Sequence, residues 1–176
     1  KNLQKLSFNQ TDESKIIIFP TTTFFETGRC SLNQELDLYT DYFERKISKV
    51  NNQIIIKPHP NSKQNKIEML YKCLKDKGYK VFNPQILNEI IFSKIPMSTL
   101  PLEVFCFILN IKVNIPYKNI CLTINSNASL STLLLFSDLG FIRPFGSELV
   151  TKYIKNEFAI KRISQEEKIM KHILRN

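Results

Sequence analysis

One histidine stands between two prolines in the run Lys57-Pro58-His59-Pro60. Proline fixes its own φ and restricts the residue before it, so this turn should present the imidazole from a nearly rigid backbone. An imidazole held in this way suits phosphate binding or proton donation to a leaving phosphate. The alternative is that His59 only hydrogen-bonds its own loop. The second histidine, His172, lies among lysines near the end of the chain, and we expect it on the surface.

A carboxylate occupies an unusual position at Glu103, directly after Pro101 and Leu102 in an otherwise apolar segment. Burying a carboxylate is costly unless it has a partner. Near a helix N-terminus the helix dipole offsets roughly 0.3–1 kcal/mol of that cost. Glu103 could accept two hydrogen bonds from ribose hydroxyls, as acidic residues do in other nucleotide-binding α/β folds. The alternative, a first-turn carboxylate facing solvent, is equally compatible with the sequence.

The third group of interest is the hydroxyl-rich segment 125–132, which contains Ser126, Ser129 and Ser131. We expect it to lead into a helix. Exposed N–H groups and hydroxyls at a helix N-terminus can bind an anion without any lysine. The alternative is an ordinary N-cap.

Other chemical motifs are absent from the sequence. It has no GxGxxG, GxxxxGK[ST] or GxSxG pattern, and no His, Cys and Asp residues at metal-ligand spacing. We therefore expect neither a metal nor a bound cofactor. The four cysteines, Cys30, Cys73, Cys106 and Cys121, stand far apart without a CxxC pair. Reduced thiols in a cytoplasmic protein are the simplest interpretation.

The elements that must position these residues follow an alternating pattern. Apolar, β-branched runs alternate with amphipathic segments of helix length, which predicts an α/β fold with a Rossmann-like, mainly parallel sheet and flanking helices. All three groups above should follow strands or open helices, where such sheets bind ligands. We expect strands at 15–19, 53–57, 79–82 and 120–124. We expect helices at 32–49, from 65 to 78, at 85–91, at 101–109 and from about 129 to 139.

Local signals predict where several helices begin and end. Ser31 and Gln34 form a capping-box pattern, and Gly78 is placed to end the helix that begins near residue 65. Gly140 should end the helix that follows the serine segment. The tail, about 147–176, should hold two helices, the second opened by a capping box at Ser164 and Glu167.

The length and net charge of the chain limit the classes of protein to which it can belong. The chain has 176 residues and a formal net charge of +9, which suggests one domain with an anionic partner. No run approaches the roughly 18 apolar residues of a membrane-spanning helix. The first residues lack the apolar core of a signal peptide and there is no initiator Met, so we expect that an N-terminal part is missing. We expect a cytoplasmic protein that can associate peripherally with the inner face of the plasma membrane.

The three groups together resemble the nucleotide-binding half of bacterial sialyltransferases and polysialyltransferases of GT-B fold. That family carries an HP motif, a ribose-binding glutamate in a P-x-E-like context and a serine motif, in this order. The matching segments here are 54–60, 101–104 and 126–132, and the resemblance extends over roughly residues 15–140. Residues 1–176 would then form one nucleotide-sugar-binding domain, and the acceptor-binding half would be the missing N-terminal part.

The resemblance implies a role for each residue. His59 would contact the phosphate of CMP-sialic acid and assist departure of CMP, and Pro60 would fix the turn. Glu103 would hold the cytidine ribose. Ser129, with Ser126 or Ser131, would bind phosphate oxygens, although the adjacent serine pair of the family is interrupted here by Ala128 and Leu130. The general base of the family belongs to an acidic motif that Glu26-Thr27-Gly28 matches only in part, with Glu26 as the candidate.

The implied reaction is an inverting transfer of sialic acid from CMP-sialic acid to a cell-surface glycan, in capsule or lipooligosaccharide. Donors aimed at the departing phosphate would stabilise its developing charge. The partners would be a nucleotide-sugar donor and a glycan acceptor, and the chain alone would bind the donor without turning it over.

Two alternatives remain from the sequence. CDP-glycerol glycerophosphotransferases also carry a Lys-x-His-Pro motif, but their Asp-Tyr-Ser-Ser signature is absent here. A basic nucleic-acid-binding module would account for the net charge of +9. The lysines, however, are scattered and are not combined with aromatic platforms, so we expect no nucleic-acid partner.

Overall fold

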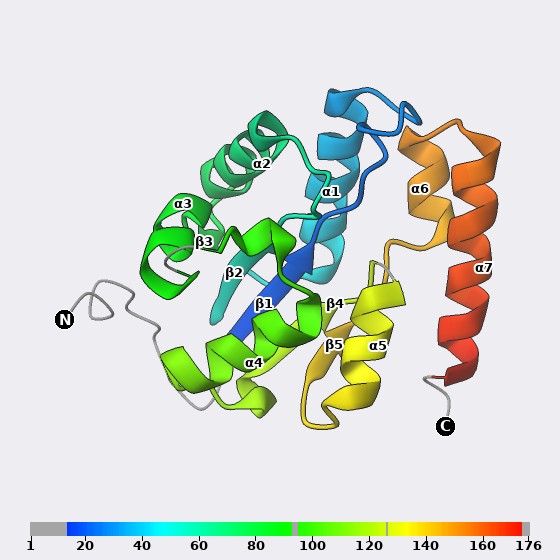
Figure 1. The fold of residues 1–176 in the computed structure, drawn as a ribbon. Coiled ribbons are helices and arrows are strands. Elements are labelled where there is room, and N and C mark those ends of the chain that lie inside the picture. Colours follow the sequence, from blue (N-terminus) through cyan, green and yellow to red (C-terminus); the bar gives the residue numbers. More distant parts are fainter. Residues whose placement is uncertain (1–13, 93–94, 126, 174–176) are drawn as a thin grey trace.

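A five-stranded parallel sheet forms the centre of the molecule (Figure 1). The computed structural model describes residues 14–92, 95–125 and 127–173. The strand order is β3-β2-β1-β4-β5. The strands are β1 Lys15–Pro20, β2 Asn52–Lys57, β3 Lys80–Val81, β4 Ile120–Thr123 and β5 Gly140–Ile142. The α/β, Rossmann-like fold predicted from the sequence is confirmed.

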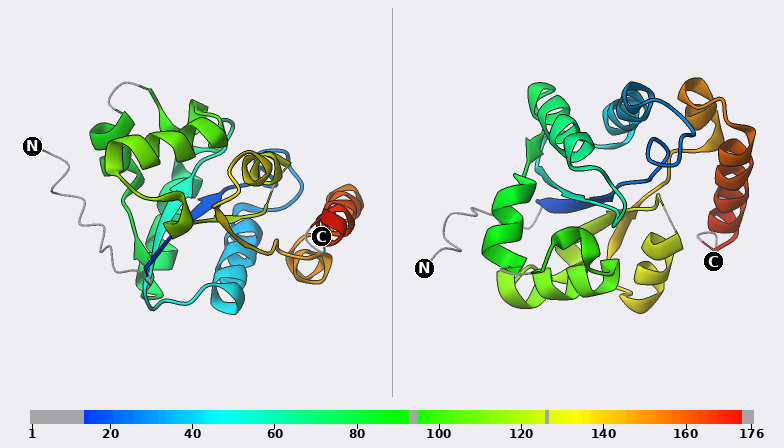
Figure 2. Two further views of the ribbon diagram at one scale, coloured as in Figure 1. Left: turned by 90° about the horizontal axis from the view of Figure 1, so that it is seen from below. Right: turned by 45° about the horizontal axis from the view of Figure 1, so that its top comes forward.

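Helices cover both faces of this sheet, as the views in Figure 2 show. One face carries α1 Leu32–Lys46, α2 Gln64–Asp76, α6 Ser147–Tyr153 and α7 Glu157–Ile173. The other carries α3 Pro84–Leu87, a π-helical turn Asn88–Phe92, α4 Leu102–Val113 and α5 Asn127–Leu135. Short 3-10 turns at Met97–Thr99 and Tyr117–Asn119 precede α4 and β4.

The sheet has an apolar core on each face, because successive side chains of a strand point to opposite faces. Ile17 and Phe19 point into the core beneath α1 and α2, whereas Ile16 and Ile18 point into the core beneath α4. Strands buried on both faces are continuous apolar runs, which explains the isoleucine-rich sequences of β1 and β2.

The chain leaves β1 toward β2 and β3, and then returns to place β4 on the other side of β1. The strand order therefore reverses between β1 and β4. In open α/β sheets, ligands bind outside the carboxyl ends of the strands at such a point. This edge of the sheet carries the turn after β2 and the segment between β4 and α5.

One helix end was predicted wrongly. The helix after the serine segment ends at Leu135, and Gly140 begins strand β5 instead of capping that helix. Gly140 pairs with Cys121 of β4, and a Cβ at position 140 would lie 2.5 Å from the Cys121 sulfur. The glycine is therefore required by a close approach between strands, which local sequence does not reveal.

The prediction of a helix start at Ser164 was also wrong. Ser164 lies inside α7, which runs unbroken over Glu157–Ile173. Glu167 accepts hydrogen bonds from the backbone N–H (3.0 Å) and the hydroxyl (2.9 Å) of Ser147 at the start of α6. The Glu167 carboxylate thus caps the start of α6 and not the start of its own helix. The predicted tail does contain two helices, and the predicted helix 32–49 ends earlier, at Lys46.

Candidate nucleotide-sugar site

The His-Pro turn is fastened to the end of β1. The backbone N–H of His59 donates to Oγ1 of Thr21 (3.0 Å), and that oxygen lies 2.9 Å from Oγ of Ser62. The His59 Nδ1 atom accepts a hydrogen bond from the backbone N–H of Asn61 (3.1 Å). A neutral imidazole that accepts at Nδ1 carries its proton at Nε2. The turn therefore presents an exposed imidazole whose Nε2–H is a donor.

The electrostatic surroundings favour the neutral form of this histidine. Burial lowers the pKa of His59, and the positive charges of Lys57 and Lys66 lower it further, against an opposing effect of Glu26. An anion bound beside the ring would raise the pKa of His59. His59 is thus suited to donate a hydrogen bond to a ligand oxygen whose negative charge increases during reaction. His172 is exposed on α7, as expected.

Glu26 is engaged in structural contacts beside this turn. Its Oε1 accepts from the backbone N–H of Lys63, the N-cap residue of α2 (2.9 Å), and its Oε2 accepts from Lys66 Nζ (2.7 Å). Burial acts to raise the pKa of Glu26, but the hydrogen bonds from Lys66 and Lys63 lower it overall. A carboxylate with a lowered pKa is a weak proton acceptor. The contacts therefore indicate that Glu26 holds the start of α2, and its role as general base stays a prediction.

A second glutamate completes a buried ionic network that the sequence did not indicate. Lys66 and Glu35 are both fully buried, and Lys66 Nζ lies 3.3 Å from Glu35 Oε1. Lys66 also donates to the backbone carbonyl of Thr22 (2.7 Å). Glu35 accepts from the hydroxyls of Thr22 and Tyr39. This network joins α1, α2 and the segment after β1.

Lys57, directly before the turn, is another residue that the sequence did not single out. It is 5 % exposed, and its Nζ donates to the carbonyls of Pro58 (3.1 Å) and Ser98 (3.4 Å). The ammonium also lies 5.9 Å from the centre of the Phe105 ring. Burial lowers the pKa of Lys57 to about 8. The spacing Lys-Pro-His was visible in the sequence, but the burial was not.

Glu103 lies half-buried in the first turn of α4. It has no hydrogen bond or ion pair to another residue in the described part of the chain. Its negative charge contributes to the raised pKa of Cys106, one helical turn later, although burial is the larger cause. Glu103 is thus a carboxylate with free acceptor capacity, as ribose binding requires.

The serine segment opens α5, as expected, and its serines differ in burial. Ser126 lies outside the described residues. Ser129 is fully buried in α5, whereas Ser131 is exposed. Residues two positions apart on a helix lie on different faces, in keeping with the different burial of these two serines. The serine contacts to phosphate stay predictions.

Asn125, between β4 and α5, shows an unused acceptor. Its side-chain amide donates to Oγ1 of Thr123 (3.0 Å) and to the carbonyl of Pro20 (3.4 Å). Its Oδ1 is buried and has no hydrogen-bond partner among the residues that the structure describes. Buried polar groups are nearly always paired, and exceptions are often found where a ligand or water binds. Asn125 also lies between the ends of β1 and β4, where the strand order reverses.

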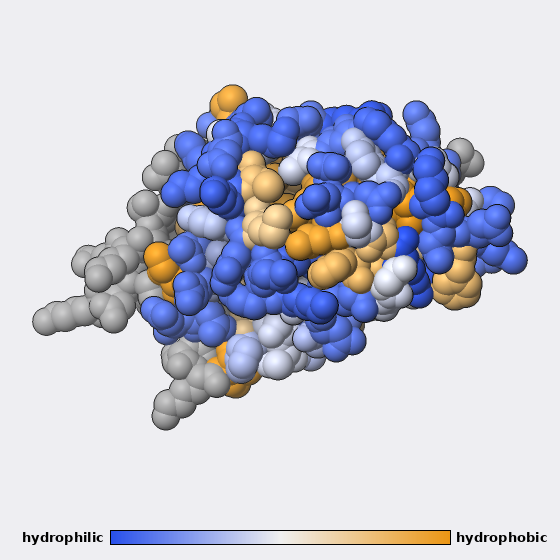
Figure 3. Space-filling view, turned by 90° about the horizontal axis from the view of Figure 1, so that it is seen from above, coloured by the Kyte–Doolittle hydropathy of each residue, from blue (hydrophilic) through white to orange (hydrophobic). Residues whose placement is uncertain are grey.

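A cavity of about 140 Å³ lies beside the His-Pro turn and is lined by Pro58, Ser62, Met97 and Ser98, among others. Ligand pockets commonly measure roughly 300–1,000 Å³, so this cavity holds at most part of a nucleotide sugar. Figure 3, seen from above, shows apolar groups gathered in the middle of one face with hydrophilic residues around them. Such surfaces commonly mark contact sites.

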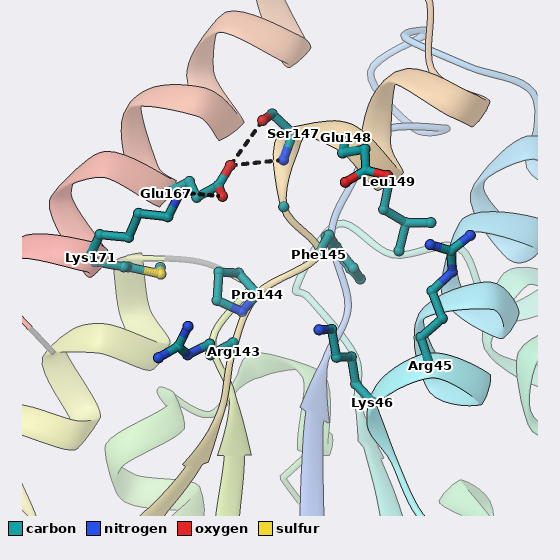
Figure 4. Close-up of a pocket in the computed structure, with 12 residues that line it drawn as sticks. Arg45, Lys46, Arg143, Pro144, Phe145, Ser147, Glu148, Leu149, Glu167 and Lys171 are labelled. Atoms are coloured by element: carbon teal, nitrogen blue, oxygen red, sulfur yellow. Dashed lines mark hydrogen bonds and ion pairs between the residues drawn. The ribbon is translucent and has the colours of Figure 1, made fainter.

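A larger cavity of about 590 Å³ lies between the end of α1, the segment after β5, and α7 (Figure 4). None of the predicted site residues lines it. Its charged lining comprises four basic residues and two acidic ones: Arg45, Lys46, Arg143, Lys171, Glu148 and Glu167. Glu167 is occupied by Ser147 and Lys171. The cavity is therefore basic, and it is separate from the His-Pro turn.

A family model for alpha-2,8-polysialyltransferases (POLYST) matches residues 1–100, more than half of the chain. The chain belongs to the alpha-2,8-polysialyltransferase family. Membership supports a glycosyltransferase of the sialyltransferase kind, with a nucleotide-sugar donor and a glycan acceptor. The match includes Glu26, His59 and Pro60, whereas Glu103 and the serine segment lie beyond it. The chain has no significant match among curated proteins or solved structures.

Two further properties of this polysialyltransferase chain concern its described residues. None of its helices combines the length and apolar character that crossing a bilayer needs. No three His, Cys, Asp or Glu side chains gather closely enough in the described ranges to hold a metal ion. The expectation that the reaction needs no metal stays a prediction.

Proposed function

We propose that this chain binds CMP-sialic acid at the carboxyl edge of its sheet and that the complete enzyme transfers the sialic acid, with inversion, to a cell-surface glycan of capsule or lipooligosaccharide. The observation that carries the proposal is the held imidazole of His59, which accepts at Nδ1 and whose Nε2 has no hydrogen-bond partner among the described residues. The family match and the parallel sheet with its reversal at β1 and β4 support it.

In the proposed reaction, an acceptor hydroxyl oxygen attacks the anomeric carbon of sialic acid. The bond from that carbon to the phosphate oxygen of CMP breaks, and its electron pair stays on the phosphate. His59 Nε2–H donates to this oxygen, so the hydrogen bond strengthens as negative charge develops there. The proton of the acceptor hydroxyl passes to a base, for which Glu26 remains the candidate.

The nucleoside would lie between the His-Pro turn and α4. Glu103 would accept from the ribose hydroxyls, since its carboxylate has acceptor capacity. Asn125 Oδ1 would accept from a further N–H or O–H of the donor, which would pair this buried oxygen. The acceptor would be held mainly by a second Rossmann-like half, as in other GT-B enzymes, and this chain alone would bind the donor without turnover.

Titration calorimetry of the purified chain with CMP, CDP, UDP and GDP tests the proposal. We expect selective binding of cytidine nucleotides, weakened roughly 10- to 100-fold by His59→Ala or Glu103→Ala through loss of a charge-assisted hydrogen bond. His172→Ala and Glu157→Ala, which alter an exposed histidine and an exposed first-turn carboxylate, are the matched controls. Tight uridine binding with cytidine ignored would overturn the assignment.

The same titrations address the alternatives. A CDP-glycerol glycerophosphotransferase would bind CDP-glycerol more tightly than CMP-sialic acid. A nucleic-acid-binding module would shift unrelated DNAs in a gel with strong salt dependence. We expect neither result.

A further inference from the structure

Two lysines are buried in the described part of the chain, and they differ in their surroundings. Lys66 is paired with the carboxylates of Glu26 and Glu35. Lys57 has no ion-pair partner among the described residues and donates to two backbone carbonyls. Burying a cation without a carboxylate is costly, and an apolar residue of similar size is often as stable or more stable at such a position. Stability alone therefore does not account for a lysine at position 57.

The two carbonyls belong to different parts of the candidate site. That of Pro58 lies in the His-Pro turn itself, next to His59. That of Ser98 lies in the 3-10 turn Met97–Thr99, a few residues before the helix that carries Glu103. Both Pro58 and Ser98 line the cavity of about 140 Å³. One ammonium group thus connects the His-Pro turn to Ser98, which is 41 residues from Lys57 in sequence.

We propose that Lys57 is a positioning residue for the donor site, because its ammonium fastens the His59 turn to the segment that leads into Glu103. The proposal rests on the proposed donor site. Lys57 acts through His59 and Glu103 and is not assigned a contact with the substrate.

The charge of Lys57 also acts on His59. Together with Lys66, and against Glu26, it lowers the pKa of the imidazole, after the larger effect of burial. The other titratable group that acts on Lys57 is the buried Cys106 thiol of α4. Burial raises the pKa of Cys106 to about 12, so the thiol stays neutral near pH 7. Lys57 therefore favours the uncharged, Nε2-protonated form of His59 before an anion binds.

The first test needs no ligand. The NMR titration midpoint of His59 is measured in the wild type, Lys57→Met, Lys57→Gln and Lys57→Arg, with His172 as the internal reference. We expect the midpoint to move measurably to higher pH in the Met and Gln variants, because a nearby positive charge is lost, and to stay close to the wild type in Lys57→Arg. Lys63→Met, which removes an exposed charge at the start of α2, is the control and should leave it unchanged.

The second test measures coupling by calorimetry with CMP. We expect His59→Ala and Glu103→Gln each to weaken binding about 10-fold in the wild type, but less than threefold in the Lys57→Met background, because neither group is then held in place. Lys57→Gln replaces the Met variant if the latter does not fold. The proposal would be overturned if Lys57→Met left the His59 midpoint unchanged and if His59→Ala and Glu103→Gln still weakened CMP binding about 10-fold in the Lys57→Met background. If the wild type fails to bind CMP, the proposed function fails, and the His59 midpoint still decides the role of Lys57.

Discussion

Oγ1 of Thr21 accepts a hydrogen bond from the backbone N–H of His59, across the ends of two neighbouring strands. Thr21 directly follows β1, and its own backbone N–H donates to the carbonyl of Lys57 (3.0 Å). The two bonds extend the β1–β2 pairing beyond the sheet. They hold the backbone of the His59 turn at the carboxyl edge of the sheet, next to the end of β1.

Thr21→Val should therefore weaken CMP binding. The substitution keeps the shape of the side chain but removes the acceptor, so the His59 N–H loses its partner and the turn loosens. We expect roughly 10-fold weaker binding by calorimetry. Thr21→Ser keeps the hydroxyl and should bind nearly as the wild type does. Equal affinities of the Val and Ser variants would contradict this role of Thr21.

The buried network predicts a large effect of Lys66→Met. This change leaves the carboxylates of Glu35 and Glu26 without their cation, and breaking a buried ion pair costs about 3–5 kcal/mol of unfolding free energy. Lys77→Met removes the exposed pair with Glu44 and should change the unfolding free energy little. Urea denaturation at pH 7 measures both. Similar losses in the two variants would show that burial of the network does not matter.

The lowered pKa of Glu26 predicts a pH dependence. The unfolded carboxyl titrates near its ordinary pKa of 4.5, and the folded one titrates lower. The unfolded state thus binds more protons as the pH falls through this window, so the contribution of Glu26 to stability is present above 4.5 and is lost below it. We expect the stability advantage of the wild type over Glu26→Gln to shrink from pH 6 to pH 3. An advantage that stayed constant in urea titrations over this range would refute the assignment.

The approach of β5 to β4 predicts a rescue experiment. Gly140→Ala places a Cβ 2.5 Å from the Cys121 sulfur and should lower the unfolding free energy by about 1–3 kcal/mol. The double variant Cys121→Ala/Gly140→Ala removes the sulfur, and we expect it to be more stable than Gly140→Ala alone. Thermal unfolding followed by circular dichroism gives the comparison. If the losses of unfolding free energy from the two single substitutions added up in the double variant, there would be no steric conflict between positions 121 and 140.

Cys106 should be unreactive in the native protein. It is fully buried, and burial raises its pKa to about 12, so little thiolate is present near pH 7. We expect iodoacetamide to label Cys73, which is partly exposed, well before Cys106. Mass spectrometry of quenched samples gives the order of labelling. Rapid labelling of Cys106 would argue for a reactive thiol.

Features that depend on near neighbours could be predicted from the sequence. The capping box of Ser31 and Gln34 is present, and Gly78 follows α2 with a positive φ of 85°. The isoleucine runs form β1 and β2 as expected. These elements were predictable because the signals that specify them, a capping pattern, a glycine or a continuous apolar run, lie within a few residues.

The errors came from contacts over long sequence distances. Gly140 is required by Cys121 in the neighbouring strand, and Glu167 caps a helix 20 residues earlier. The local pattern suggested a helix end at Gly140 and a helix start at Ser164. Tertiary packing instead places Gly140 in β5 and Ser164 inside α7.

The same division holds for the candidate site. The sequence by itself determined a histidine held between two prolines after a buried strand, because proline restricts the backbone wherever it occurs. Only the tertiary structure decided that Thr21 anchors this histidine, that Lys57 joins its turn to the segment before Glu103, and that Glu26 is bound to a buried lysine. The physical reason is that hydrogen bonds and ion pairs join residues about 40 positions apart, and burial, which sets their strength, exists only once the sheet has assembled.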